Sequence, residues 1–124
     1  MIYKVYDALK NNNLIQQKVG NRIKFYEYPP TKDMQGVYIV IDPIDTPKPG
    51  DYADNKWLTD EYLYQIDVWS KKLQDTQSVA KEVRQIMWAE LGFSQDSTGP
   101  DEFDKDTGIY RDARRYRGKE YVNI

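Results

Sequence analysis

The chain of 124 residues contains no cysteine and no histidine. The lack of cysteine excludes disulfides and thiolate nucleophiles, and the two absences together exclude zinc sites of the usual kinds. Without histidine, the commonest general base near neutral pH is also missing. The residue types therefore predict neither a metal, nor a cofactor, nor a catalytic residue.

Other motifs for chemistry fail on spacing. The seven glycines are scattered singly, so no phosphate-binding loop occurs. Glu102, Asp104 and Asp106 are spaced like the start of a calcium loop, but the glycine that such a loop needs would fall on Thr107 or Ile109. Carboxylate pairs such as Asp60–Glu61 are common at strand starts, and nothing marks this pair as buried. These failures favour a protein that is not an enzyme.

No apolar run approaches the roughly 20 residues that cross a bilayer, so no membrane span is expected. Hydrophobic residues at 40% and charged residues at 31% indicate a globular chain, and its length predicts a single domain over residues 1–124. The N-terminal sequence MIYKVYDALK lacks the features of a signal peptide, so the chain is expected to stay inside the cell that makes it.

Tyrosine is abundant, with 11 Tyr against 3 Phe and 3 Trp. A tyrosine ring has an apolar body and a polar tip, which suits surfaces that partners bury, although such residues also border small cores. The sequence leaves both interpretations open.

The clearest local pattern runs from Tyr62 to Leu91. Its first part alternates as a strand, and Asp75 then stands where a helix N-cap is expected. Gly92 is the predicted helix end. The apolar stripe of this helix is Val79, Val83, Ile86, Met87 and Leu91. The helix is therefore predicted to pack this stripe on a sheet.

Shorter elements are predicted on either side. Helical spacing from Ile2 to Leu9 indicates an N-terminal helix, followed by a short turn with Leu14, Ile15 and Val19. Strands are predicted at RIKFYEY, at VYIVID and from Phe93. The Pro-rich residues 43–56 are predicted to form a long exposed loop at the tip of an extended hairpin that runs from Val37 to Ser70.

The C-terminal third is polarised in charge. An acidic segment, expected as a solvated turn, precedes IYRDARRYRGKEY, whose charges on both faces suggest an edge strand or an intersubunit surface. The opposite charges either pair within one subunit or face each other across neighbouring subunits. Phosphate binding by the arginines is less favoured, because the acidic residues lie just upstream and the net charge is −2.

The order of the pieces KVGNRIKFYEYPP, GVYIVID, YLYQIDVWSKKLQDTQSVAKEVRQIM and DTGIYRDARRYRG resembles the tail terminator (tail completion) proteins of long-tailed bacteriophages. The similarity covers nearly the whole chain. Its most specific parts are QIDVWS with the helix that follows, and the terminal GIYR…RYRG.

The resemblance implies an α+β fold with a mainly antiparallel sheet, packed by the N-terminal helix and the central amphipathic helix. It further implies a homo-hexameric ring in the virion tail or neck, assembled in the host cytoplasm. Such a ring caps the tail tube, stops its polymerisation, and docks to the head connector while DNA passes through without specific binding.

Two alternatives stay open: a head-to-tail joining or stopper protein of the neck on the connector side, and a small nucleic-acid-binding domain. For a ring, the expected contact residues with neighbouring subunits or partners are those of the Pro-rich stretch and of the polarised C-terminal third. They are Pro47, Pro49, Tyr52, Trp57, Asp104, Asp106, Arg111, Arg114, Arg115 and Arg117.

Overall fold

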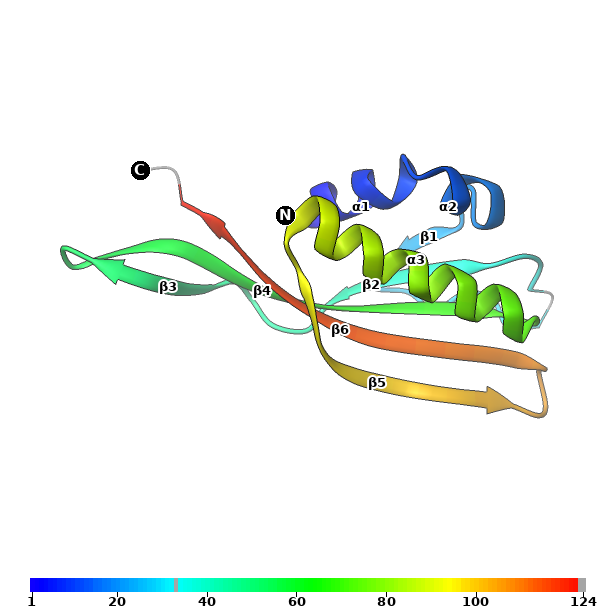
Figure 1. The fold of residues 1–124 in the computed structure, drawn as a ribbon. Helices are drawn as coiled ribbons and strands as arrows, with labels where there is room; N and C mark the ends of the chain where they lie inside the picture. Colours follow the sequence, from blue (N-terminus) through cyan, green and yellow to red (C-terminus); the bar gives the residue numbers. More distant parts are fainter. Residues whose placement is uncertain (33, 123–124) are drawn as a thin grey trace.

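A computed structural model describes residues 1–32 and 34–122 (Figure 1). The helices are α1 (Ile2–Lys10), α2 (Asn13–Lys18) and α3 (Leu73–Leu91). The strands are β1 (Ile23–Phe25), β2 (Tyr38–Pro43), β3 (Lys48–Ala53), β4 (Lys56–Ser70), β5 (Ser94–Asp104) and β6 (Ile109–Tyr121).

The strands form one six-stranded sheet in the order β1-β2-β4-β6-β5, and β3 pairs with the first part of β4. Only β1 and β2 run parallel, and the other pairs are antiparallel. The predicted class, α+β with a mainly antiparallel sheet, an N-terminal helix and a central helix, is confirmed.

The helices lie together on one face of the sheet (Figure 1). The predicted stripe of α3 packs on this face, where Val79, Val83, Ile86 and Met87 are buried and Leu91 packs at the border. Strand alternation places Tyr64, Ile66 and Val68 of β4 against the stripe. At roughly 1.5–3 kcal/mol for each fully buried aliphatic side chain, this layer is the main source of stability.

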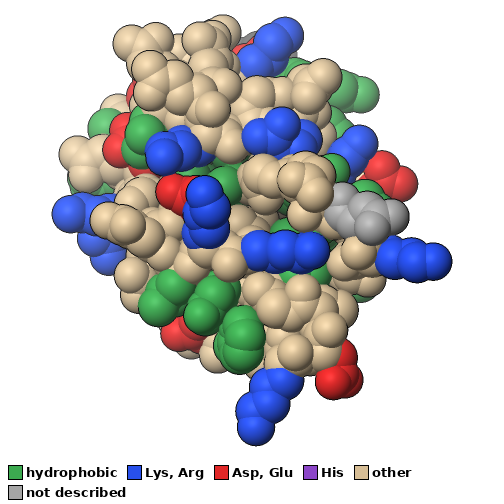
Figure 2. All heavy atoms as spheres, turned by 90° about the vertical axis from the view of Figure 1, so that its right-hand side faces the viewer, with side chains coloured by type: hydrophobic (Ala, Val, Ile, Leu, Met, Phe, Trp, Pro, Cys, Tyr) green, Lys and Arg blue, Asp and Glu red, His purple; other side chains and the backbone are tan. Residues whose placement is uncertain are grey.

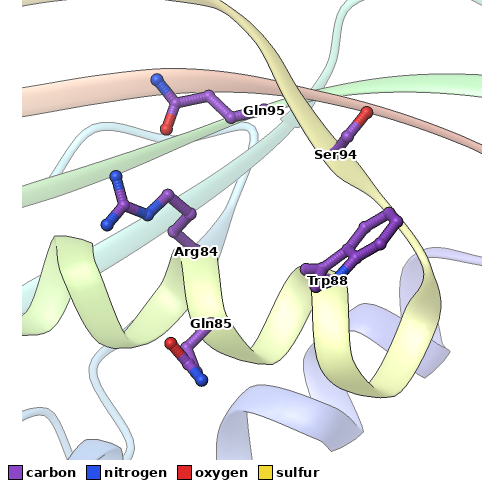
Figure 3. A pocket seen from close by; sticks show the side chains of 5 residues that line it. All are labelled: Arg84, Gln85, Trp88, Ser94 and Gln95. Carbon is purple, nitrogen blue, oxygen red and sulfur yellow. The ribbon is translucent and has the colours of Figure 1, made fainter.

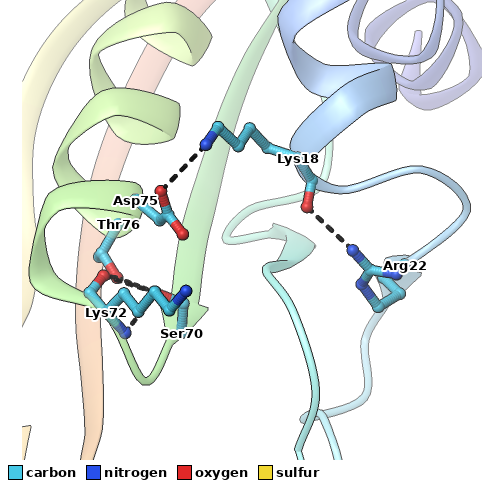
Figure 4. Close-up of polar contacts among 6 residues, drawn as sticks. All are labelled: Lys18, Arg22, Ser70, Lys72, Asp75 and Thr76. Carbon is cyan, nitrogen blue, oxygen red and sulfur yellow. Dashed lines mark hydrogen bonds and ion pairs between the residues drawn. The ribbon is translucent and has the colours of Figure 1, made fainter.

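The prediction that Asp75 caps α3 is wrong. Lys72 holds the N-cap position without a side-chain cap, and Asp75 lies in the first turn, where it accepts from Lys18 Nζ at 3.2 Å (Figure 4). Ser70 and Thr76 join their hydroxyls at 2.6 Å beside this turn. The helix therefore starts earlier, because these buried hydroxyls order the connection from β4. Gly92 ends α3 in the left-handed region at φ 70°, as predicted.

The sequence predicted a loop for the whole Pro-rich stretch, and this is wrong. Lys48–Ala53 forms β3, which pairs with β4 from Lys48↔Glu61 to Ala53↔Lys56, interrupted at Asp51. Asp54 and Asn55 make a two-residue turn with φ values of 50° and 63°. Two consecutive left-handed residues of the Asp/Asn type are typical of the turn that matches strand twist in hairpins. Pro49 is tolerated because β3 lies at the sheet edge.

Two predictions for the C-terminal third are corrected. The acidic segment is mostly strand, since β5 runs to Asp104 and pairs with β6. β6 is not an edge strand, because it lies between β4 and β5. Gly118 of β6 is needed at its position, since a Cβ there would lie 2.2 Å from the ring of Phe93. That ring is thereby held in the core beside Tyr64.

Candidate subunit interface

Part of the sheet projects beyond the helices (Figure 1). We call this part the arm: β3, the facing residues Lys56–Glu61 of β4, and Lys119–Tyr121 of β6, which continue the pairing on the other side of β4. Tyr52 faces Trp57, and Tyr121 faces Thr59 two residues further along β4. Because alternate residues of a strand share a face, these three aromatic side chains lie on one face of the arm.

The aromatic face of the arm is open to solvent. Exposed fractions are 67% for Tyr52, 48% for Trp57 and 78% for Tyr121. Exposed clusters of Trp and Tyr are unusual on monomers and are enriched at protein–protein contacts. The predicted interface residues Tyr52 and Trp57 are thus brought together, and Tyr121 joins them.

A polar cluster holds the three strands of the arm together. The Asp51 carboxylate accepts from Thr59 Oγ1 at 2.7 Å and from Lys119 Nζ at 2.9 Å. These hydrogen bonds lower the pKa of Asp51 below its ordinary value, and the bond from Thr59 has the largest effect. Because one carboxylate ties β3 to both β4 and β6, the arm has a defined shape.

The two predicted prolines lie apart. Pro49 is part of the arm opposite Asp60, whereas Pro47 lines a groove of about 510 Å³ at the arm's base. Tyr26, Tyr62 and Tyr64 line the same groove. Pro47 therefore belongs to a second, aromatic surface next to the arm.

The face of the sheet away from the helices contains an ion pair whose carboxylate, on Asp67, is fully buried. Arg111 donates to Asp67 Oδ2 from Nε at 2.8 Å and from Nη2 at 2.7 Å. Gln65 donates to the other oxygen of Asp67 at 3.0 Å, and Arg115 donates to Gln65 at 3.0 Å. Asp67 is fully buried, so this network replaces the water that its charge would otherwise need.

Aromatic side chains enclose Arg111. Its guanidinium lies 5.0 Å from the ring centroid of Trp69 and 5.5 Å from that of Tyr28. Burial disfavours the charged guanidinium, but the hydrogen bonds and charge of Asp67 outweigh it and raise the pKa of Arg111. Arg111 is thus a structural centre that fastens the segment between β1 and β2 to the sheet.

The other predicted arginines also have partners within the subunit. Arg114 pairs with Asp112 at 2.9 Å, and Arg117 with Asp96 at 3.4 Å. Asp104 accepts from the backbone N–H of Asp106 in the β5–β6 turn, so these two acids shape the turn rather than pair with the arginines. The alternative of pairing within one subunit therefore describes Arg111, Arg114 and Arg117. Glu102 and Asp96 of the acidic segment pair with Arg111 and Arg117, each at 3.4 Å, whereas the partners Asp67 and Asp112 lie outside that segment.

A small groove lies between α3 and the start of β5 (Figure 3). Arg84, Gln85 and Trp88 line it from the helix, and Ser94 and Gln95 from the strand, around about 280 Å³. Trp88 is 65% exposed. Arg84 has no ion-pair partner among residues 1–32 and 34–122. The groove thus combines an aromatic wall with an available positive charge.

Lys and Arg side chains are spread across the end of the molecule opposite the arm (Figure 2). Two cations near α3 are already engaged, since Lys18 pairs with Asp75 and Arg22 donates to the Lys18 carbonyl at 2.9 Å (Figure 4). This end offers a weakly basic surface without a built anion site.

The tyrosines divide between core and surface. Burial raises the pKa of Tyr64 and of Tyr116 to about 12, and both rings belong to the core. Tyr3, Tyr26 and Tyr52, by contrast, are largely exposed. The interpretation that tyrosines border the core is therefore confirmed for Tyr64 and Tyr116, and contact with partners stays a prediction for the exposed ones.

Within the part of the chain that the structure describes, no group of three or more acidic residues is placed to hold a metal. None of the described helices is long and apolar enough to cross a membrane.

Sequence reasoning missed Asp67 as the partner of Arg111. Alternation placed Asp67 on the face of β4 away from the helices, but the strand register that sets it beside Arg111 depends on a pairing across 44 residues. It also missed Arg84 and Trp88, whose positions on the polar side of α3 were the available signal.

Comparisons with known proteins identify the fold. No model of a known protein family matches the chain, and no curated protein matches it by sequence. A solved structure described as the virion of a native gene transfer agent particle contains a chain with the same fold, at a TM-score of 0.69 and 15% sequence identity. The match covers 95% of this chain and 92% of that chain. The arrangement of helices and strands is thus shared, nearly end to end, with a component of a virion.

Proposed function

We propose that this chain is a structural protein of a phage-like virion, and within it a tail terminator that forms a homo-hexameric ring. The observation that carries the proposal is the fold, shared over almost the full length of both chains with a component of a gene transfer agent virion. The motif order that resembles tail terminators supports the finer assignment. The role is assembly rather than catalysis.

The surface chemistry agrees with this role. A closed ring of identical subunits needs two different complementary surfaces on each subunit. The exposed aromatic face of the arm and the grooves beside the helices lie on different parts of the molecule. In the proposed ring, the arm residues Pro49, Tyr52 and Trp57 contact a partner, and so does Pro47 at the arm's base.

The partners in this proposal are other copies of the chain, the tail tube protein and the head connector, in the tail or neck of the virion. The expected contact residues of the C-terminal third differ in how accessible they are to a partner. They are Asp104, Asp106, Arg111, Arg114, Arg115 and Arg117. Arg111, Arg114 and Arg115 are partly buried and have partners within the subunit. Arg117, Asp104 and Asp106 are the more accessible members.

Electron microscopy of particles from a phage that lacks this protein tests the proposal. A terminator stops tube growth, so its loss gives overlong or headless tails. Filled heads without tails, together with free tails of normal length, would instead identify a neck protein on the connector side. Normal particles would reject both roles.

A further inference from the structure

We propose that the arm of one subunit docks into the groove between α3 and β5 of a second copy of this chain. The inference rests on the proposed ring and specifies its subunit contact. The arm tip carries Tyr52 and Trp57, and the receiving groove is formed by Arg84, Gln85, Trp88, Ser94 and Gln95.

The two surfaces are complementary in charge. Residues 45–61 and 119–121, which form the arm and its base, contain six acidic residues and three lysines. Asp54 stands at the turn of the arm and has no ion-pair partner in residues 1–32 and 34–122. The exposed side of α3 presents Lys81 and Arg84 beside the groove. Opposite charges on the two surfaces steer association and fix orientation.

The size of the groove suits one large side chain. The groove is open and holds about 280 Å³, near the lower end of the roughly 300–1,000 Å³ that is typical of small-molecule sites. An aromatic side chain inserted next to Trp88 has an aromatic wall and a guanidinium within reach (Figure 3). Trp, Tyr and Arg are the residue types that dominate contact energies between proteins.

The two surfaces lie on different parts of the subunit, as a head-to-tail contact requires. The arm projects away from the helices, whereas the groove lies beside α3 on the body of the molecule (Figure 1). A contact between different surfaces of identical subunits is head-to-tail, so it leaves each subunit with one arm and one groove for its two neighbours. Hexagonal closure then uses every arm and every groove.

Because the chain has no cysteine, engineered cysteines report this contact directly. Ala53→Cys lies at the arm tip and Gln85→Cys in the groove, both at exposed positions. The two single variants, mixed in solution and in assembled particles, are expected to form a disulfide-linked pair under mild oxidation. The rate should exceed by about 10-fold that of a control pair, Ala53→Cys with Thr31→Cys in the exposed segment between β1 and β2.

A second set of variants tests the side chains themselves. Arg84→Glu and Trp57→Ser, each added to the pair, are expected to slow cross-linking about 10-fold, while circular dichroism confirms that each variant is folded. Equal rates for the groove and control pairs would overturn the inference. So would a cross-link from Ala53→Cys to a different virion protein, or a fast cross-link that neither substitution slows.

Failure here is distinguishable from failure of the proposed function. If the loss of the protein gives overlong or headless tails but the groove pair cross-links no faster than the control, the terminator stands and its subunits meet elsewhere. If the cross-link forms while particles lacking the protein are normal, the self-contact stands without the terminator role.

Discussion

Strand β4 belongs to two regions that differ in how they are stabilised. Its second part, in the body, is covered by α3 on one face and carries the Asp67 network on the other. Residues Gln65–Val68 are buried there. Its first part, in the arm, has strands on both sides but no helix over it, and Trp57 remains exposed (Figure 1). The comparison teaches that one continuous strand is buried in the core along one stretch and leaves an aromatic side chain exposed along the other.

Two ion pairs within the body show a similar contrast. Asp67, the partner of Arg111, is fully buried, whereas Arg117 and Asp96 pair at 3.4 Å with nearly half of each side chain exposed. Exposed pairs contribute about 0–1 kcal/mol, but removal of one partner of a buried pair leaves an uncompensated charge. Ion pairs of the same chemical type therefore contribute differently to the stability of the fold.

The largest effect is expected for Asp67→Ala. This change leaves the enclosed guanidinium of Arg111 without its carboxylate, so we expect a loss of about 3–5 kcal/mol in unfolding free energy. Urea denaturation measures it. Asp96→Ala is the matched control, with an expected loss of at most about 1 kcal/mol. Similar losses for the two variants would show that the network is not a structural centre.

The next largest loss of unfolding free energy is expected from a cavity in the core. Ile86→Ala removes a buried side chain from the stripe of α3, which costs about 2–5 kcal/mol. The neighbouring exposed Gln85→Ala serves as the control, since surface changes stay within about 0.5 kcal/mol. If denaturation did not separate the two variants, α3 would not pack on the sheet as described.

Alkaline pH should weaken the body through Tyr116. Its pKa is raised from 10.0 to about 12 by burial, so the folded state holds the phenolic proton more tightly. The associated stability is complete below pH 10 and is lost as pH rises toward 12, by roughly 3 kcal/mol. Tyr116→Phe should remove its share of this pH dependence in denaturation curves and leave the share of Tyr64, whose pKa is also raised to about 12. Tyr121→Phe, at an exposed position, should leave it unchanged.

The sequence predicted the body well because local patterns determine it. The period of α3, the alternation in β4 and Gly92 as helix end each depend on residues close together in the chain. The same holds for α1 and for β2.

The arm and the Asp67 network were harder to predict for two physical reasons. Proline suggested a loop at β3, but an edge strand tolerates a residue that cannot donate a hydrogen bond. The Asp67–Arg111 pair depends on the register between β4 and β6, and that register is set by packing of the whole sheet rather than by local spacing. For the same reason the sequence showed an arginine-rich strand without showing that β6 is internal.

The smallest effect on stability is expected at the arm, where function should respond most. Trp57→Ser removes an exposed ring from a region without a helix over it, so the unfolding free energy should change by no more than about 0.5 kcal/mol. Capping of tail tubes should nevertheless fail, since exposed tryptophans at contacts between proteins often contribute 2 kcal/mol or more. Tube length after assembly in vitro measures this.

Leu73→Ser is the control for that experiment, because Leu73 is also about half exposed, at 47%, but lies at the start of α3, outside the arm and the groove. Its capping activity should remain. If Trp57→Ser destabilised the chain as much as Ile86→Ala, the arm would be part of the folding unit and the two regions of β4 would not be separable. If it left both stability and capping intact, the aromatic face would be solvated surface, and recognition would have to lie on the body of the molecule.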